Sequence, residues 1–213
     1  MLTYKEIVYG LELAGTIAFA SSGALLAIRK NMDIFGISVL GIVTALGGGL
    51  IRDLILNVTP PNMFRNPTYV LTAIGTACAL FILIYRRKNL LNSRYMKRYE
   101  GFMTVMDTIG LSTFTVTGIH VGIDGAYGNE RFLLIFLGVI TGVGGGMIRD
   151  VLAGETPYVL VRHVYACASL AGAVTAVFLK DVIGDGNAMI LGAVVVGVIR
   201  YLAIVKNWNL PRI

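Results

Sequence analysis

The chain has 213 residues, of which 56% are hydrophobic and only 14% are charged, and its mean hydropathy is +0.76. Soluble domains carry about 25% charged residues, so this composition excludes a soluble globular protein and indicates an integral membrane protein. The formal net charge of +6 comes from basic segments between apolar stretches, so it indicates neither nucleic-acid binding nor an acidic substrate.

Seven apolar stretches each approach the roughly 20 residues that a helix needs to cross a bilayer. In chain order they lie at about 7–28, 34–56, 68–86, 102–122, 132–153, 163–180 and 187–206. These stretches leave almost no sequence for a soluble domain. We therefore expect an all-α integral membrane protein whose single transmembrane domain covers residues 1–213.

Basic residues in the connecting segments predict how the chain is oriented. The segment between the third and fourth stretches contains six basic residues and one acid, so the positive-inside rule places it in the cytoplasm. Over all loops and tails, eleven basic residues then lie inside and four outside. We expect an external N-terminus and a cytoplasmic C-terminus.

The second and fifth stretches share a motif. GGGLIRD at 47–53 returns as GGGMIRD at 144–150, and the surrounding segments 41–60 and 138–157 align without gaps at an offset of 97. Ten of the twenty aligned positions are identical. Such a match indicates an internal duplication.

The duplication extends to the preceding spans, where an offset of 95 matches Glu12 with Asp107. Spans one to three (about 7–86) are repeated as spans four to six (about 102–180), and 187–206 forms an additional seventh helix. Because each repeat has three spans, an odd number, the second copy enters the membrane from the opposite side. The sequence therefore predicts a 3+3 inverted repeat plus one helix.

Inverted repeats commonly place a transport pathway at the repeat interface, where interrupted helices line it. We expect the glycine triplets to break or kink their helices and to expose backbone carbonyls to a wet pathway. Close helix packing is the alternative role for these glycines. Threonines one turn earlier would add hydroxyl oxygens. The predicted pathway residues are Thr44, Gly47, Gly48, Gly49, Thr141, Gly144, Gly145 and Gly146.

Charged residues inside the spans are functional hypotheses by default. Neighbours on a helix point about 100° apart, so we expect Arg52 to pair with Asp150 and Arg149 to pair with Asp53 across the repeats. Glu12 and Asp107 are rival partners, and the Arg-Asp pairs have the alternative role of reaching the membrane interface. Four acids and two arginines leave a net charge of −2 if all are ionised, which favours a cationic or zwitterionic solute.

A seven-span chain of this length, with GGG-x-x-RD in its second and fifth spans, resembles the prokaryotic trimeric intracellular cation (TRIC) channel family. The resemblance covers essentially the whole chain. It implies a homotrimer in which each subunit has its own pore, formed around kinked second and fifth helices at the glycine triplets. It also implies permeation of potassium, with sodium as a further candidate. Related bacterial sequences are described as glycine transporters.

We interpret the chain as a potassium-permeable channel of a prokaryotic plasma (inner) membrane, contacting membrane lipids and requiring no cofactor. The charges at Arg52, Asp53, Arg149 and Asp150 would set the local field or latch a gate. The alternative is a secondary transporter for glycine or a similar zwitterion. A purely structural membrane protein is a third reading, which the duplicated charges disfavour. No nucleophile–base set or metal-ligand cluster occurs, so we expect neither an enzyme nor a metal beyond the permeating ions.

Overall fold

The computed structural model describes residues 4–86, 93–161, 164–206 and 208. Within them, seven helices are long and apolar enough to cross a membrane, as predicted. They are α1 (Tyr4–Arg29), α2 (Ile34–Ile55), α4 (Pro67–Arg86), α5 (Ser93–Gly122), α6 (Arg131–Leu152), α8 (Tyr165–Ile183) and α9 (Asp185–Val205). A short π-helical segment, η2 (Ile123–Tyr127), continues α5.

Two short helices follow the helices that carry the glycine triplets. They are α3 (Asn62–Arg65), after α2, and α7 (Tyr158–Val161), after α6. Neither was expected from the sequence, because four residues carry too little periodicity to identify a helix. Their matching positions in the two halves extend the repeat into the loops.

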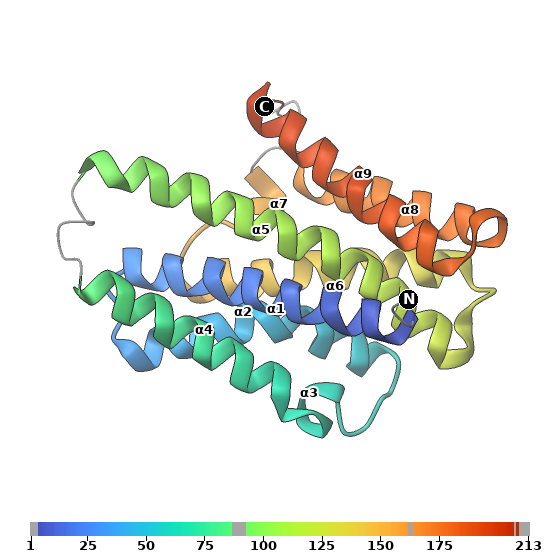
Figure 1. Ribbon diagram of the computed structural model, residues 1–213, viewed down its shortest axis with the longest axis horizontal. Helices are drawn as coiled ribbons and strands as arrows, with labels where there is room; N and C mark the ends of the chain where they lie inside the picture. Colours follow the sequence, from blue (N-terminus) through green and yellow to red (C-terminus); the bar gives the residue numbers. More distant parts are fainter. Residues whose placement is uncertain (1–3, 87–92, 162–163, 207, 209–213) are drawn as a thin grey trace.

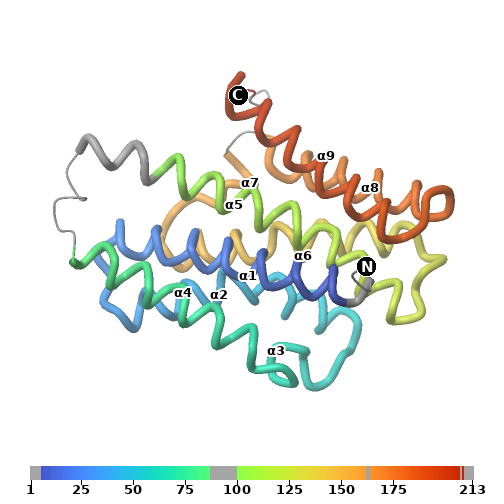
Figure 2. The backbone as a smooth tube through the Cα atoms, viewed as in Figure 1, coloured from blue at the N-terminus to red at the C-terminus, as the bar shows by residue number. Residues whose placement is uncertain are grey.

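Corresponding helices of the two halves run in opposite directions. In Figure 1, α1 starts at the right and runs left, whereas α5 runs from left to right. Figure 2 shows the same opposition for α2 and α6. The predicted inverted repeat is confirmed.

The two repeats meet along α2 and α6, which pack against each other, while α1 packs on both α2 and α5. α4 covers α1 and α2, and α8 covers α5 and α6. The additional helix, α9, packs on α8 and α5. A central apolar cluster joins the two halves through residues such as Phe19, Ala45, Leu111 and Val143.

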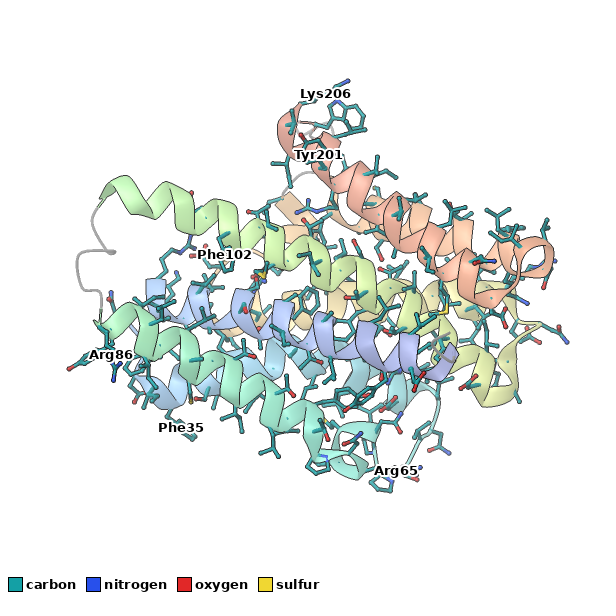
Figure 3. All side chains as sticks on the ribbon, in the orientation of Figure 1. Phe35, Arg65, Arg86, Phe102, Tyr201 and Lys206 are labelled. Atoms are coloured by element: carbon teal, nitrogen blue, oxygen red, sulfur yellow. The ribbon has the colours of Figure 1, made fainter. Side chains whose placement is uncertain are left out.

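The outer surface of the bundle carries large apolar side chains, as a lipid-facing surface requires. Phe35 and Tyr201 project from it and are 74% and 66% exposed (Figure 3). Small residues instead occupy the helix contacts, where Ala73, Ala77 and Ala173 are fully buried. This distribution is the one expected of helices associating within a bilayer.

Ion pairs join loop and helix ends at one end of the bundle. Glu155 accepts contacts from Arg29 at 3.0 Å and Lys30 at 2.7 Å, and Arg29 also lies 3.5 Å from Glu100. The hydrogen bond from Lys30, helped by the charge of Arg29, holds the pKa of Glu155 below its ordinary value of 4.5. These pairs link the end of α1 to the loop after α6 and to α5.

Candidate functional site

The glycine triplets are the point at which α2 and α6 cross. A Cβ atom on Gly48 would lie 3.0 Å from the carbonyl carbon of Thr141 and closer still to its oxygen. A Cβ atom on Gly145 would lie 3.1 Å from the carbonyl carbon of Thr44 and likewise closer to its oxygen. Each helix therefore places its backbone directly against the other, with pseudo-two-fold symmetry.

The expected break at the triplets is absent. α2 is helical from Ile34 to Ile55 and α6 from Arg131 to Leu152, so both run through their glycines without interruption. The prediction of a break was wrong because it attributed the role of the glycines to their conformational freedom. In this structure the glycines matter because they have no side chain, which allows two intact helices to approach closely.

Thr44 and Thr141 lie at the same crossing and are almost fully buried. Their hydroxyl groups donate to the carbonyl oxygens one turn earlier, from Thr44 to Leu40 at 2.5 Å and from Thr141 to Leu137 at 2.6 Å. The hydroxyl hydrogens are therefore used within the helices. Each hydroxyl oxygen keeps acceptor capacity, and Thr141 lines the cavity described below.

A first cluster of polar side chains lies at the end of the bundle where α2 ends. We call Glu12, Arg52, Asp53 and Tyr69 the first half-site. Arg52 donates to Asp53 Oδ1 from Nε at 2.9 Å and from Nη2 at 2.7 Å. Tyr69 donates a short hydrogen bond to the Glu12 carboxylate. The other Asp53 oxygen accepts the backbone N–H of Asn62 at 2.8 Å, which attaches α3 to the end of α2.

The first half-site faces a cavity of about 310 Å³. Its walls come mainly from α1, α2, α3 and the start of α4, all within the first repeat. Gly49 also lines it, and at its inner side it reaches Phe114 of α5 and Thr141 of α6. The cavity therefore leads from the first half-site to the interface between the repeats.

The second repeat has a matching cluster at the opposite end, consisting of Asp107, Arg149, Asp150 and Tyr165, which we call the second half-site. Arg149 donates from Nη1 to Asp107 Oδ1 at 2.6 Å and from Nε to Asp150 Oδ1 at 2.8 Å. It also donates to Ser22 of the first repeat at 2.6 Å. Every member of this cluster is at most 3% exposed, whereas Glu12 and Tyr69 are only partly buried.

The second half-site also repeats the attachment of a short helix. Asp150 Oδ2 accepts the backbone N–H of Tyr158 at 2.9 Å, as Asp53 does for Asn62. The hydroxyl of Tyr165 and Oδ2 of Asp107 have no hydrogen-bond partner within the described part of the chain. The two half-sites thus share one plan, and the second is sealed from solvent.

The predicted cross-repeat pairs, Arg52 with Asp150 and Arg149 with Asp53, are wrong. Each arginine pairs with the aspartate that follows it, because the long guanidinium arm bends back to its neighbour. The helices cross at Gly48 and run in opposite directions, so each Arg-Asp pair lies about 6 Å beyond the crossing toward a different end. Of the rival partners, Asp107 does bind Arg149.

Sequence reasoning missed three contributors. Tyr69 and Tyr165 each stand at the start of the third span of a repeat, but neither of the offsets used for the other spans aligns them with each other. Arg200 lies within the predicted seventh span, and the charge count over the spans overlooked it. It is 2% exposed, and its guanidinium carbon lies 4.8 Å from the Tyr165 ring centroid. Among the described residues, no group of His, Cys, Asp and Glu is arranged to hold a metal ion.

A family model described as a glycine transporter matches residues 9–85 and 104–181, which are the two repeats. Two curated relatives are each 38% identical to the chain. The inner membrane protein YadS of Escherichia coli K12 matches over 210 residues, covering 96% of this chain and 95% of the relative. A UPF0126 membrane protein of Deinococcus radiodurans matches over 207 residues, covering 94% and 89%.

The fold is also similar to solved structures of TRIC channels. A prokaryotic TRIC channel superimposes with a TM-score of 0.85 at 30% identity, covering 97% of this chain and 100% of that one. The TRIC trimeric intracellular cation channel orthologue from Rhodobacter sphaeroides gives 0.83 at 35% identity, covering 95% and 99%. By its sequence, its repeat and its fold, the chain belongs to the prokaryotic TRIC channel family, which includes the UPF0126 membrane proteins.

Proposed function

We propose that the chain is a potassium-permeable monovalent cation channel of a prokaryotic inner membrane, assembled as a homotrimer with a pathway inside each subunit. Three solved relatives at 30–35% identity are described as TRIC channels, one of them as trimeric, and the relative YadS is an inner membrane protein. The three solved relatives are described as channels, and the TRIC family is not a family of enzymes. The observation that carries the proposal is the polar cavity leading to the crossing of α2 and α6.

The chemistry of the cavity suits a cation. Glu12 and Asp53 contribute two carboxylates, and Arg52 and the exposed Arg65 contribute two guanidinium groups. Because Arg52 pairs with Asp53, Glu12 remains as the acidic group inside the cavity. Acidic groups at a pore mouth attract cations and repel anions. The Thr141 hydroxyl and the backbone around Gly49 supply neutral oxygens further in, the ligands with which a pore replaces the hydration shell of potassium.

The pathway is closed between the two half-sites. Phe114, at the inner side of the cavity, contacts Phe19, with ring centroids 5.3 Å apart. These phenylalanines are equivalent in the two repeats, and Phe19 is 1% exposed. An apolar constriction of this kind stops ions because water does not fill it. Opening requires α2 and α6 to move apart at the contacts of Gly48 and Gly145.

The assigned roles follow from these positions. The glycine triplets form the moving contact, the threonines add oxygen ligands, and the charged half-sites set the field at either end. Asp53 and Asp150 also fasten the short helices α3 and α7, so a movement of α2 or α6 is transmitted to the mouths.

One observation favours the alternative of a transporter for glycine or a similar zwitterion. The cavity contains both a carboxylate, Glu12, and a guanidinium, Arg52, which are the groups that an amino acid's ammonium and carboxylate require. A cavity open toward one end and sealed toward the other is also the arrangement of an alternating-access protein. The family model's description agrees with this reading.

Reconstitution separates the two functions. In planar bilayers with a potassium gradient, a channel gives discrete single-channel currents that reverse near the potassium equilibrium potential. Uptake of external labelled glycine into proteoliposomes of the same lipid composition tests the alternative. Vesicles that accumulate or exchange glycine while remaining electrically silent would overturn the channel proposal.

A further inference from the structure

Glu12 is a carboxylate within a membrane span, and it forms no ion pair with any residue that the structure describes. It is partly buried in α1 and lines the cavity of the first half-site. The hydroxyl of Tyr69 donates to one of its two oxygens. Carboxylates inside membrane spans ordinarily pair with a cationic group. The second oxygen of Glu12 therefore keeps its acceptor capacity beside the cavity.

The second repeat shows what a carboxylate at this position binds. Asp107 is the equivalent of Glu12, and it accepts a hydrogen bond from Nη1 of Arg149 at 2.6 Å. The guanidinium of Arg149 also lies over the ring of Tyr158, with its carbon 5.3 Å from the centroid. A charge-assisted hydrogen bond and an aromatic ring thus hold a guanidinium group against this carboxylate.

In the first repeat the equivalent arginine does not take this place. Arg52 directs its hydrogen bonds from Nε and Nη2 to Asp53 and leaves Glu12 without a guanidinium. The cavity of about 310 Å³ borders Glu12 and Arg52, and Tyr69 and Phe114 contribute to its walls. Small-molecule pockets measure about 300–1,000 Å³, so this cavity has room for a ligand larger than a single potassium ion.

A second arginine, Arg65, lines the cavity at its exposed edge. Its side chain lies at the outer edge of the bundle (Figure 3), and its Nη2 donates to the carbonyl oxygen of Thr59 at 2.8 Å. Water screens such an exposed charge strongly. The formal charges around the cavity sum to zero, but they are separated in space. Arg52 pairs with Asp53, Arg65 is at the exposed edge, and Glu12 is the anionic group of the interior.

We propose that the cavity binds a small organic cation that carries N–H donors, such as guanidinium or an alkylammonium ion, against Glu12. The ligand takes the place that the Arg149 guanidinium has at Asp107 in the second repeat. It donates to the second oxygen of Glu12, and the aromatic walls formed by Tyr69 and Phe114 favour a cation. A ligand bound there lies between the mouth and the crossing of α2 and α6, so it blocks the potassium current. The block rests on the proposed channel function, whereas the binding does not.

Thermal melts of the purified protein in detergent test the binding. At constant ionic strength set with potassium chloride, guanidinium chloride at low millimolar concentration should raise the melting temperature, because a ligand of the folded state stabilises it. Tetramethylammonium chloride, whose cation has no N–H donor, should have no such effect. Equal stabilisation by both salts would overturn the role of the N–H donors. Stabilisation by glycine and not by guanidinium would replace the proposed ligand class with a zwitterion.

Variants at the cavity assign the binding to Glu12. Glu12→Gln keeps the size of the side chain but removes its charge, so it should weaken guanidinium binding at least about tenfold. Glu6→Gln is the matched control, since Glu6 is an exposed acid of the same helix outside the cavity, and it should leave the affinity unchanged. Arg65→Gln should strengthen binding, because it removes a like charge from the cavity edge.

Size-exclusion chromatography establishes which of these variants fold. A folded Glu12→Gln variant that binds guanidinium as tightly as the wild type refutes the assignment. If Glu12→Gln does not fold, Arg65→Gln decides, and weaker or unchanged binding in that variant overturns the proposed site.

Planar-bilayer recordings in potassium chloride test the block. Guanidinium chloride added to one chamber at a time should reduce the current of a single channel from one side only, because at the other end Asp107 already holds Arg149. Equal block from both sides, or a conducting channel that guanidinium leaves unaffected, would overturn the inference. A protein that binds guanidinium through Glu12 but never passes current would instead refute the proposed function, so the two failures are distinguishable.

Discussion

Replacing Gly48 or Gly145 by alanine tests the crossing of α2 and α6 directly. The added methyl group would lie 3.0 or 3.1 Å from a carbonyl carbon of the facing helix and still closer to its oxygen. Backbone atoms cannot rotate away, so the helices must separate. Overpacking a core costs about 1–3 kcal/mol, and a clash with main chain lies at the upper end of that range. Alanine's better helix propensity, about 1 kcal/mol, offsets only part of it.

The measured quantity is the free energy of unfolding in detergent, obtained from a thermal or denaturant titration. Gly75→Ala in α4 is the matched control, because a Cβ there meets nothing within 4 Å. We expect Gly75→Ala to change stability by less than about 1 kcal/mol, and both crossing variants to lose about 2 kcal/mol. Replacing Gly48 or Gly145 by leucine, a larger side chain, should also reduce conduction more than it reduces the yield of folded protein. Crossing variants as stable as Gly75→Ala would refute the contact, and normal flux in the leucine variants would place the pathway elsewhere.

Three further predictions concern charge and orientation. In double-mutant cycles on unfolding free energy, Arg149 and Asp107 should show coupling of at least about 1 kcal/mol, whereas Arg52 and Asp150 should show almost none; comparable coupling for the second pair would restore the cross-repeat latch. The pKa of Glu155 is lowered in the folded protein, so its stabilising effect is present above the ordinary value of 4.5 and is lost as the pH falls through the folded pKa. Acid titration of Glu155→Gln should lack that loss, and an unchanged acid limb would contradict the ion pairs. Reporters fused to the two termini should read external for the N-terminus and cytoplasmic for the C-terminus; both ends on one side would exclude seven spans.

Much of the fold was predictable because hydropathy and duplication are properties of the sequence itself. The seven spans agree with the observed helices to within a few residues at most ends, and the offset between the two copies of GGG-x-x-RD predicts the inverted repeat. An odd number of spans per repeat decides the inversion without any information on packing. The short helices α3 and α7 were not predictable in this way, since their boundaries depend on hydrogen bonds to distant aspartates.

The site was harder to predict because it depends on where two helices cross. The sequence identifies Gly48 and Arg52 as unusual but does not say which lies at the contact. Placing the crossing at the glycines moves the arginine to one end of the bundle and Arg149 to the other, which rules out the predicted pairs. A glycine triplet is equally compatible with a broken helix and with two intact helices in contact, and only the position of the facing Thr141 backbone distinguishes them.

The two half-sites differ in how strongly their ion pairs are shielded from water. Burying Arg149 against Asp107 and Asp150 removes three charges from water, which is costly unless the geometry is close to ideal. In the first half-site, Arg52 and Asp53 keep the same pairing beside a cavity, where hydration lowers that cost. A movement that opens the second half-site would hydrate its charges, so part of the cost of separating the helices is returned. In the proposed channel, two matched clusters at opposite ends would allow the pathway to open by exchanging buried for hydrated ion pairs.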